Sequence, residues 1–549
     1  MAPSDSTRPA LQWDGVSVSI GEHAVLHDVH LSLEAGSTLA LVGESGSGKT
    51  MCCMAALGLL PDGGRLTSGS IHGPDGCWAS GNGETLVPIP RGRTITMVFQ
   101  EPMTSLNPTM RCGQQVAEVI RRHQGISAQK AQQQVLELFH EVQLPEPRRA
   151  WSSYPHGLSG GQKQRVLIAM ALANSTDIIL ADEPTTALDS TLRAELLDLI
   201  ADIQKRRGLA LVLVTHDMDV VERAADHVAV LKDGRVVEQG PVADVLQQPQ
   251  DAYTRGLLAC RVPRSGRPTP LPVLSDFMGG EAVDVTREEL RPPAEDAPVL
   301  LDIKGACKTY PGAAVSALSE VDLSLRQGGT LGIVGGSGCG KTTLARAILG
   351  LHRLDRGAIT LDGRPVQDLE ADQVRHIRSN VGLVFQDPRS ALNPRRRIGD
   401  AIEEVLIRWG HGKAEANREA RKLITAVGLE EDALNRKPDA LSGGQRQRIV
   451  IARALAADPK LLICDEAVAA LDVSVQAQVL NLLVELRRER GLALLFISHD
   501  LGVVRYLCDH TVVMDAGRVV ESGSSDAIWA SPAHEVTRRL QSAGGGAIA

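Results

Sequence analysis

The chain repeats itself. Five motifs occur twice and in the same order, beginning with GESGSGKT at Gly43–Thr50 and GGSGCGKT at Gly335–Thr342. The other pairs are FQEPMTSLNP and FQDPRSALNP, LSGGQKQR and LSGGQRQR, IILADE and LLICDE, and THD and SHD. Because five ordered motifs do not recur by chance, the chain is a fused duplicate. We expect one domain at 1–260 and another at 299–549, called here the first and second copy, with a Pro-rich linker at 261–298.

Composition limits what such a chain can do. At 549 residues it is too long for one ordinary core, and 43% hydrophobic with 23% charged residues is the balance of a globular protein. A net charge of −8 argues against a dedicated nucleic-acid binder. No apolar run reaches the roughly 18–20 residues needed to cross a bilayer, and the N-terminus lacks signal-peptide features, so membrane work would depend on partners. The nine cysteines show neither regular nor metal-ligand spacing, which favours reduced thiols.

Short apolar runs alternate with longer helical stretches in both copies. Buried parallel strands are predicted at Thr38–Val42, Ile178–Ala181, Leu211–Val214, Leu331–Val334, Leu461–Cys464 and Leu494–Ile497. Helices are predicted at Lys49–Leu60, Gly161–Ala173 and Ser190–Lys205. This alternation predicts an α/β fold with its ligand site at the strand ends. Extra residues of the first copy fall mainly in or near the Gly-rich stretch His72–Gly92, which we interpret as a surface loop.

The pattern G-x-x-x-x-G-K-[ST] is a phosphate loop. Its glycines let backbone N–H groups turn toward phosphate oxygens, and the helix that follows adds the positive end of its dipole. A Gly-rich surface turn would explain one isolated match, but two matches in register, each between a strand and a helix, favour phosphate binding. The lysines should reach the β- and γ-phosphates and the threonines should ligate Mg²⁺. The predicted nucleotide contacts are Gly43, Ser45, Gly46, Gly48, Lys49 and Thr50, and Gly335, Ser337, Gly338, Gly340, Lys341 and Thr342.

Two further elements extend this chemistry. An apolar strand delivers Asp182 or Asp465 to the Mg²⁺ shell, and the next carboxylate, Glu183 or Glu466, can then polarise an attacking water. Alone, an apolar run that ends in DE is weak evidence, but here it follows LSGGQ. A serine and two glycines at a helix start form a second anion-binding terminus. The residues concerned are Ser159, Gly160, Gly161, Ser442, Gly443 and Gly444.

Together, the phosphate loop, a glutamine after a strand, LSGGQ, strand-DE, ALD and a histidine resemble an ATP-binding-cassette ATPase over nearly the whole chain. The resemblance implies two tandem nucleotide-binding domains, each with a mainly parallel sheet core and a helical subdomain, and ATP and Mg²⁺ as cofactors. It implies that each phosphate loop faces the LSGGQ of the other copy. Gln100 and Gln386 match the glutamine that senses Mg²⁺ and the γ-phosphate, and His216 and His499 match the γ-phosphate switch.

The copies differ at two places. The family usually stacks an aromatic residue on adenine upstream of the phosphate loop; the second copy offers Tyr310, whereas the first has Ile20. After the catalytic glutamate, EPTTALD of the first copy becomes EAVAALD in the second, which loses a proline and two hydroxyls. We therefore expect the two sites to hydrolyse ATP at different rates.

Several strings narrow the resemblance further. SLNP and ALNP, YPHGLSGGQ, HDLGVV and AYTRGLL resemble the ATPase subunits of the peptide and nickel importer family, here fused. This implies an energy-coupling subunit for peptides or a related small solute, such as a metal chelate, a glutathione-like compound or an opine. It also implies two integral-membrane permeases, an extracytoplasmic binding protein and a peripheral location on the cytoplasmic face of the inner membrane. Cys260 stands alone after the first copy, so we expect no iron–sulfur cluster.

Two other classes of function stay open. One is a soluble tandem ATPase that acts on ribosomes or DNA, although the linker is Pro-rich rather than a long charged helix and zinc-type Cys pairs are missing. The other is the ATPase of an exporter, which the cassette motifs fit less well.

Overall fold

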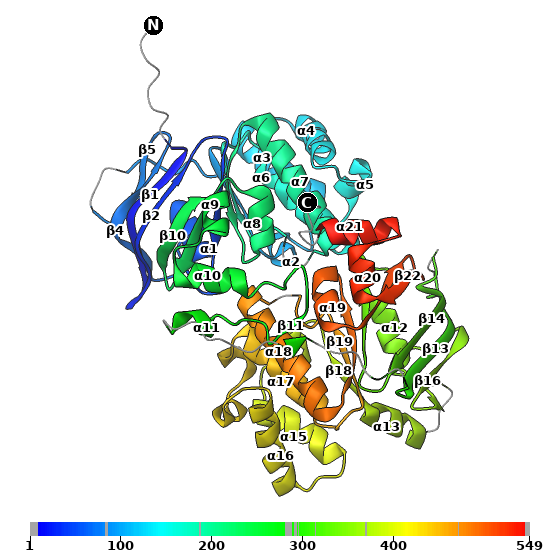
Figure 1. Cartoon of the computed structure of the whole chain (residues 1–549). Helices are drawn as coiled ribbons and strands as arrows, with labels where there is room; N and C mark the ends of the chain where they lie inside the picture. Colours follow the sequence, from blue (N-terminus) through cyan, green and yellow to red (C-terminus); the bar gives the residue numbers. More distant parts are fainter. Residues whose placement is uncertain are drawn as a thin grey trace. The chain divides into compact units, whose positions relative to one another are not determined.

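The computed structural model in Figure 1 describes residues 9–82, 86–185, 188–279, 288–289, 294, 296–312, 315–367, 371–469 and 471–543. Its contacts divide the chain into two compact units. The first comprises Met1–Leu188, Leu192–Ala259 and Leu274–Glu281, and the second comprises Asp189–Thr191, Cys260–Val273 and Ala282–Ala549. The domain limits at 260 and 299 stay a prediction.

A six-stranded sheet forms the centre of the first copy. Its strands are β3 (Thr38–Val42), β6 (Ile95–Val98), β7 (Ile178–Asp182), β8 (Ala210–Val214), β9 (His227–Lys232) and β10 (Arg235–Pro241), in the order β10-β9-β3-β8-β7-β6. All pairs are parallel except the one between β9 and β10. Every residue of β3, β7 and β8 is buried, as their continuous apolar runs require. The strands predicted for this copy are therefore confirmed.

A second, antiparallel sheet packs on the same core. It consists of β1 (Leu11–Ile20), β2 (His23–Leu33), β4 (Gly64–Gly73) and β5 (Gly76–Ser80), in the order β2-β1-β4-β5. The interpretation of His72–Gly92 as a surface loop was wrong for its first part, because β4 and β5 form a hairpin there. Trp78 of that hairpin is 3% exposed, and its indole N–H donates to Asp75 Oδ1 at 2.6 Å. Burial of this aromatic side chain favours a strand in a stretch whose glycines alone suggest a loop.

Helices cover the parallel sheet and form a separate helical subdomain. The subdomain contains α2 (Pro102–Ser105), α3 (Cys112–Gln124), α4 (Ala128–Glu141), α5 (Pro147–Ser152) and α6 (Gly160–Ala171) (Figure 1). The others are α1 (Lys49–Ala56), α7 (Ser190–Arg207), α8 (Met218–Ala224), α9 (Val242–Gln247) and α10 (Ala252–Ala259). The helix predicted at Lys49–Leu60 is shorter than expected, because α1 ends at Ala56. Gly58, with φ 60°, terminates it.

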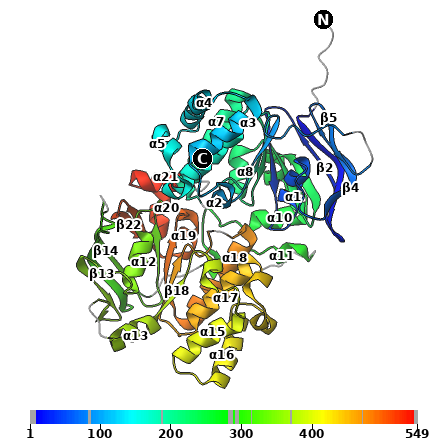
Figure 2. The same ribbon diagram turned by 180° about the vertical axis from the view of Figure 1, so that it is seen from behind.

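The second copy repeats this plan. Its mainly parallel sheet has the order β18-β19-β20-β15-β21-β22 and its antiparallel sheet the order β14-β13-β16-β17. The strands are β13 (Val299–Lys308), β14 (Leu318–Arg326), β15 (Thr330–Val334), β16 (Arg356–Leu361), β17 (Arg364–Pro365), β18 (Val381–Val384), β19 (Leu461–Asp465), β20 (Ala493–Ser498), β21 (His510–Asp515) and β22 (Arg518–Ser524). The helices are α12 (Lys341–Ile348), α13 (Ala371–Asn380), α14 (Pro388–Ala391), α15 (Ile398–Arg408), α16 (Lys413–Ala426), α17 (Gly443–Leu455), α18 (Val473–Arg490), α19 (Leu501–Leu507), α20 (Ser525–Ala530) and α21 (Glu535–Ala543). Figure 2 shows α15, α16 and α17 grouped as the helical part of this copy. The predicted α/β fold with two tandem domains is confirmed.

Part of the region expected to be a linker is bound to the second copy. We call Pro263–Leu271 the linker strap; it contains β11 (Pro268–Thr269), and α11 (Ser275–Met278) and β12 (Glu288–Glu289) follow it. The Arg505 guanidinium donates to Pro263 O, and Tyr506 Oη donates to Pro268 O at 3.1 Å. The Asn481 amide bonds to both backbone groups of Leu271, at 2.7 and 2.9 Å. The strap is therefore an ordered extension of the second copy.

Arg267 fixes the middle of the strap. It is 8% exposed and lies 3.6 Å from Asp509 and 3.2 Å from Asp526. Asp509 is itself buried and also accepts from Arg487 at 2.7 Å. A buried carboxylate needs such partners, because an unpaired buried charge is strongly destabilising.

None of the helices in the described part of the chain has the length and apolar character needed to span a bilayer.

Candidate nucleotide sites

The first phosphate loop joins β3 to α1. Gly43 has φ 147°, and a Cβ there would lie 2.1 Å from Leu231 O; Gly48 has φ 103°, and a Cβ there would lie 2.6 Å from a Leu26 methyl. Only glycine fits either position. The Lys49 ammonium is 5% exposed and donates to the carbonyls of Gly43 and Glu44, both at 2.8 Å. The loop thus wraps around its own lysine at the start of a helix, which is the arrangement of an anion site.

The sequence reasoning missed one residue that supports this loop. Tyr253, in α10, is 2% exposed, and its hydroxyl accepts from the Glu44 amide at 2.9 Å. The second copy has Val536 at the aligned place, so this support exists only in the first copy. Tyr253 belongs to the string AYTRGLL, which carries the family resemblance but does not itself indicate a contact with the phosphate loop.

The predicted catalytic side chains of the first copy meet at the end of β7. Thr50 Oγ1 lies 3.1 and 3.0 Å from the two Asp182 oxygens. Gln100 Nε2 donates to Glu183 Oε2 at 2.7 Å, and His216 Nδ1 lies 3.1 Å from Glu183 Oε1. The structure therefore brings all five side chains into one cluster.

Both glutamates predicted to be catalytic have an unusual backbone. Glu183 has φ 45° and Glu466 has φ 50°, in the left-handed region that non-glycine residues rarely occupy. Their amides donate to Val214 O at 3.0 Å and Ile497 O at 2.9 Å, which holds this conformation in place. Strain of this kind persists only where the surrounding structure enforces it, and it is concentrated at functional sites.

The second copy has the same cluster with longer contacts. Lys341 Nζ donates to the carbonyls of Gly335 and Gly336 at 2.8 and 2.9 Å. Gln386 Nε2 donates to Glu466 Oε2 at 2.6 Å. Other contacts are longer than in the first copy: Thr342 Oγ1 lies 3.5 Å from Asp465 Oδ1, and His499 Nδ1 lies 3.8 Å from Glu466 Oε1.

Burial and charge shift the acidity of these carboxyls. Burial raises the pKa of Asp182 and of Asp465 above the usual aspartate value, the threonine hydroxyl that each faces lowers it in part, and the adjacent glutamate raises it further. Burial also raises the pKa of Glu466, but His499 and Lys341 outweigh burial and hold that pKa below its usual value. Glu466 is therefore ionised at neutral pH.

The oxygen donors in each cluster suit a hard cation. A threonine hydroxyl, an aspartate carboxylate and a glutamine amide oxygen are ligands that Mg²⁺ accepts. Within the described residues there is no cluster of three or more His, Cys, Asp and Glu side chains arranged to hold a metal. A Mg²⁺ ion here would therefore need oxygens from nucleotide phosphates and water as well as from the protein.

The LSGGQ motifs begin α6 and α17. Ser159 accepts from the Gln162 amide at 3.3 Å and its own amide donates back to Gln162 Oε1 at 3.0 Å; Ser442 and Gln445 repeat this capping box. A Cβ on Gly444 would lie 2.3 Å from Val475, so packing explains that glycine. A Cβ on Gly443 would meet nothing within 4 Å among the described residues. Nothing inside its own domain therefore requires Gly443.

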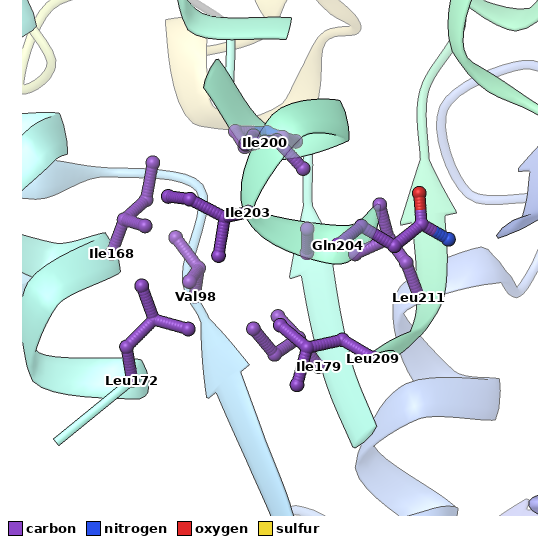
Figure 3. Close-up of a pocket in the computed structure, with 11 residues that line it drawn as sticks. Val98, Ile168, Leu172, Ile179, Ile200, Ile203, Gln204, Leu209 and Leu211 are labelled. Carbon is purple, nitrogen blue, oxygen red and sulfur yellow. The ribbon is translucent and has the colours of Figure 1, made fainter. Parts of the chain in front are cut away.

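A small apolar cavity of about 20 Å³ lies under β7 in the first copy. Figure 3 shows Ile168, Ile179, Ile203 and Leu211 around it, from α6, β7, α7 and β8. Ala181 also lines it, and the aligned residue of the second copy is Cys464, which has a larger side chain. Its lining is apolar, so this cavity is a packing defect behind the catalytic strand rather than a ligand site.

The second copy has an aromatic residue at the place predicted for the adenine platform. Tyr310 follows β13 and is half-buried, with its hydroxyl 3.4 Å from Thr343 Oγ1. Ile20 ends β1 at the aligned place in the first copy. Gly46 and Gly338, inside the loops, have φ 87° and 80° and open space where a Cβ would stand.

Comparison with known proteins agrees with this geometry. The family model described as ABC transporter matches residues 26–186 and 318–469. The glutathione import ATP-binding protein GsiA of Pectobacterium atrosepticum is 41% identical over 94% of this chain and 86% of its own length. The proteins of the same name from Salmonella typhimurium and Escherichia coli O157:H7 are 38% and 40% identical, over 98% and 95% of this chain and 90% and 86% of their own lengths. The solved structure of cbiO1 from Clostridium perfringens, 28% identical, matches 42% of this chain and 91% of its own with a TM-score of 0.40. With two matched cassettes and relatives along almost its whole length, the chain belongs to the ABC transporter family as a tandem ATPase that binds ATP.

Proposed function

We propose that this ATPase powers the uptake of glutathione or a closely related small peptide. The observation that carries the proposal is the 38–41% identity, over 94% or more of this chain, to proteins named glutathione import ATP-binding proteins. The identity spans both cassettes and the linker, so it reflects one fused subunit rather than a shared nucleotide domain.

In the first site, Lys49 would leave the loop carbonyls and bind the β- and γ-phosphates. Thr50 and Asp182 would hold Mg²⁺, whose chemistry is to neutralise charge on the phosphates. Glu183 would take the proton of the attacking water, while Gln100 and His216 fix its carboxylate and the γ-phosphate. Lys341, Thr342, Asp465, Glu466, Gln386 and His499 would play the same parts in the second site.

Each pocket would be completed by the LSGGQ of the other copy. Two observations support this part of the proposal. The helices α6 and α17 begin at the glycines of LSGGQ, and a helix start favours an anion; a Cβ on Gly443 would meet nothing within 4 Å among the described residues. A close approach by a phosphate would explain why this position stays glycine.

Import requires further components besides an ATPase. We propose two integral-membrane permease subunits, an extracytoplasmic binding protein that delivers the solute, and a peripheral position on the cytoplasmic face of the membrane. The proposal includes neither a nucleic-acid partner nor an iron–sulfur cluster.

Uptake of radiolabelled glutathione tests the proposal. Deleting the gene should abolish glutathione-dependent growth and uptake, and the wild-type chain should restore both. The Glu183→Gln, Glu466→Gln double variant should be present at the same level and restore neither, since the acceptor of the water proton is lost at both sites. Normal uptake in the deletion strain would refute the importer assignment, and glutathione efflux lost with the chain would assign it to export.

We also propose that the two sites hydrolyse ATP at different rates. The threonine–aspartate and histidine–glutamate contacts are longer in the second copy, 3.5 and 3.8 Å against 3.0 and 3.1 Å. The second copy also replaces Pro184 and Thr185 by Ala467 and Val468; a third replaced residue, Thr186, lies outside the described residues. Glu183→Gln should therefore reduce the ATPase rate more than Glu466→Gln. Equal residual rates would contradict the asymmetry.

A further inference from the structure

Three side chains of the second copy form an aromatic corner beside its phosphate loop. Tyr310 stands between Thr343, in α12, and His352, just beyond the end of that helix. The Tyr310 and His352 rings meet edge to face, with centroids 5.6 Å apart and planes at 86°. The Tyr310 hydroxyl lies 3.4 Å from Thr343 Oγ1. The phenol ring is therefore held at its tip and against one neighbouring ring.

The first copy replaces all three residues together. When the phosphate loops are aligned, Thr343 and His352 correspond to Met51 and Leu60, and when β13 is aligned with β1, Tyr310 corresponds to Ile20. Met51 and Leu60 pack against the apolar core of that copy. At each of the three positions, an aromatic or polar residue of the second copy is replaced by an apolar residue in the first.

The two corners offer different surfaces to a base. An edge-to-face pair restricts the plane of both rings, and a fixed aromatic face stacks on a base with a gain of roughly 5- to 150-fold in affinity. An isoleucine packs on a base without a preferred orientation. The second site, which has the aromatic corner, therefore gains affinity for ATP from the base. The first site, which has Ile20, Met51 and Leu60 instead, depends more on the triphosphate.

We propose that His352 is a positioning residue that fixes Tyr310 for stacking on the nucleotide base, and that only the second site consequently depends on the base for affinity. This rests on the proposed function of Tyr310 as the adenine platform. His352 Nε2 is buried and makes no hydrogen bond in the described part of the chain, so the imidazole contributes through its ring contact rather than through that nitrogen.

Binding measurements with two ligands test the proposal. Mg-ATP carries a base and Mg-tripolyphosphate does not, and Lys49→Ala silences the first loop so that the second is measured alone. In that background, His352→Leu should weaken Mg-ATP binding about two- to tenfold and leave tripolyphosphate binding unchanged. His352→Phe should retain ATP affinity, because a phenyl ring keeps the edge contact and a cavity of about 240 Å³ adjoins the site.

A matched control uses the other loop. With Lys341→Ala silencing the second site, Leu60→Met should leave the ratio of ATP to tripolyphosphate affinity unchanged. Equal weakening of both ligands by His352→Leu, or loss of ATP affinity in His352→Phe, would overturn the inference. Tyr310→Ala distinguishes the role of Tyr310 as the adenine platform from the positioning role of His352. If this variant leaves ATP affinity unchanged, Tyr310 is not the adenine platform. If it weakens ATP binding while His352→Leu does not, only the positioning role fails.

Discussion

Replacing Tyr253 by phenylalanine removes one oxygen atom from the support of the first phosphate loop. Phenylalanine fills the same buried space, so the change leaves no cavity, and it removes the 2.9 Å hydrogen bond from the Glu44 amide. Losing a hydrogen bond whose partner is partly buried costs about 1–2 kcal/mol. In a domain of this size, 1 kcal/mol lowers the melting temperature by about 2–4 °C, so a decrease of about 2–8 °C is expected.

The same free energy bears on nucleotide binding. If the hydroxyl holds the loop in its binding conformation, ATP must supply that energy in the variant, which weakens affinity by up to about 5- to 30-fold. Calorimetric unfolding measures the stability, and ATP titration in a Lys341→Ala background measures the affinity of the first site.

Tyr506→Phe is the matched control, because Tyr506 is also fully buried and its hydroxyl bonds to Pro268 O at 3.1 Å, a contact within the second compact unit. It should destabilise the second copy and leave ATP affinity at the first site unchanged. The reasoning fails if Tyr253→Phe alters neither quantity, or if Tyr506→Phe weakens the first site equally.

Three further outcomes are expected. Gly444→Ala should lower the melting temperature, because its Cβ would lie 2.3 Å from Val475. Gly443→Ala should have the melting temperature of the wild type but lose ATPase activity. Equal melting temperatures of the two variants would contradict this. Because burial raises the pKa of Asp182, its carboxylate protonates at a higher pH than a free aspartate, so Mg²⁺-dependent ATP affinity should fall early on acidification. Asp182→Asn should weaken this affinity, make it less dependent on pH than in the wild type, and raise the melting temperature at neutral pH without nucleotide. Ala181→Cys should fill part of the 20 Å³ cavity and stabilise the first copy by up to about 0.5 kcal/mol in denaturant unfolding, and a destabilised variant would show that the cavity cannot accept sulfur.

The parallel core was predictable because its signal is local. Runs such as Thr38–Val42 are buried on every residue and require no knowledge of distant partners. That the candidate catalytic side chains lie together was predictable for a similar reason, since each lies at or just after the end of a strand or at the start of a helix. Parallel strand ends bring such positions together whatever the loops do, and Thr50 meets Asp182 in this way.

Elements that depend on distant contacts were missed. The antiparallel sheet pairs β1 with β4, which lies beyond the phosphate loop in sequence, and the buried Trp78 decides whether its hairpin is a strand or a loop. Tyr253 lies 209 residues from the amide that it binds. No local pattern reveals such a partner, because the information lies in the folded chain rather than in the spacing of neighbouring residues.

The linker strap has a practical consequence for dividing the protein. A fragment that begins at residue 299 would lack Pro263–Leu271, and with it the carbonyls that Arg505 and Tyr506 bind and the guanidinium that faces Asp509. Such a cut would expose the buried charged side chains of Arg505, in α19, and Asp509, just after it. The fragment would then aggregate or unfold at a lower temperature for reasons unrelated to nucleotide. A fragment that contains the second copy should instead begin before Cys260, so that it includes the linker strap.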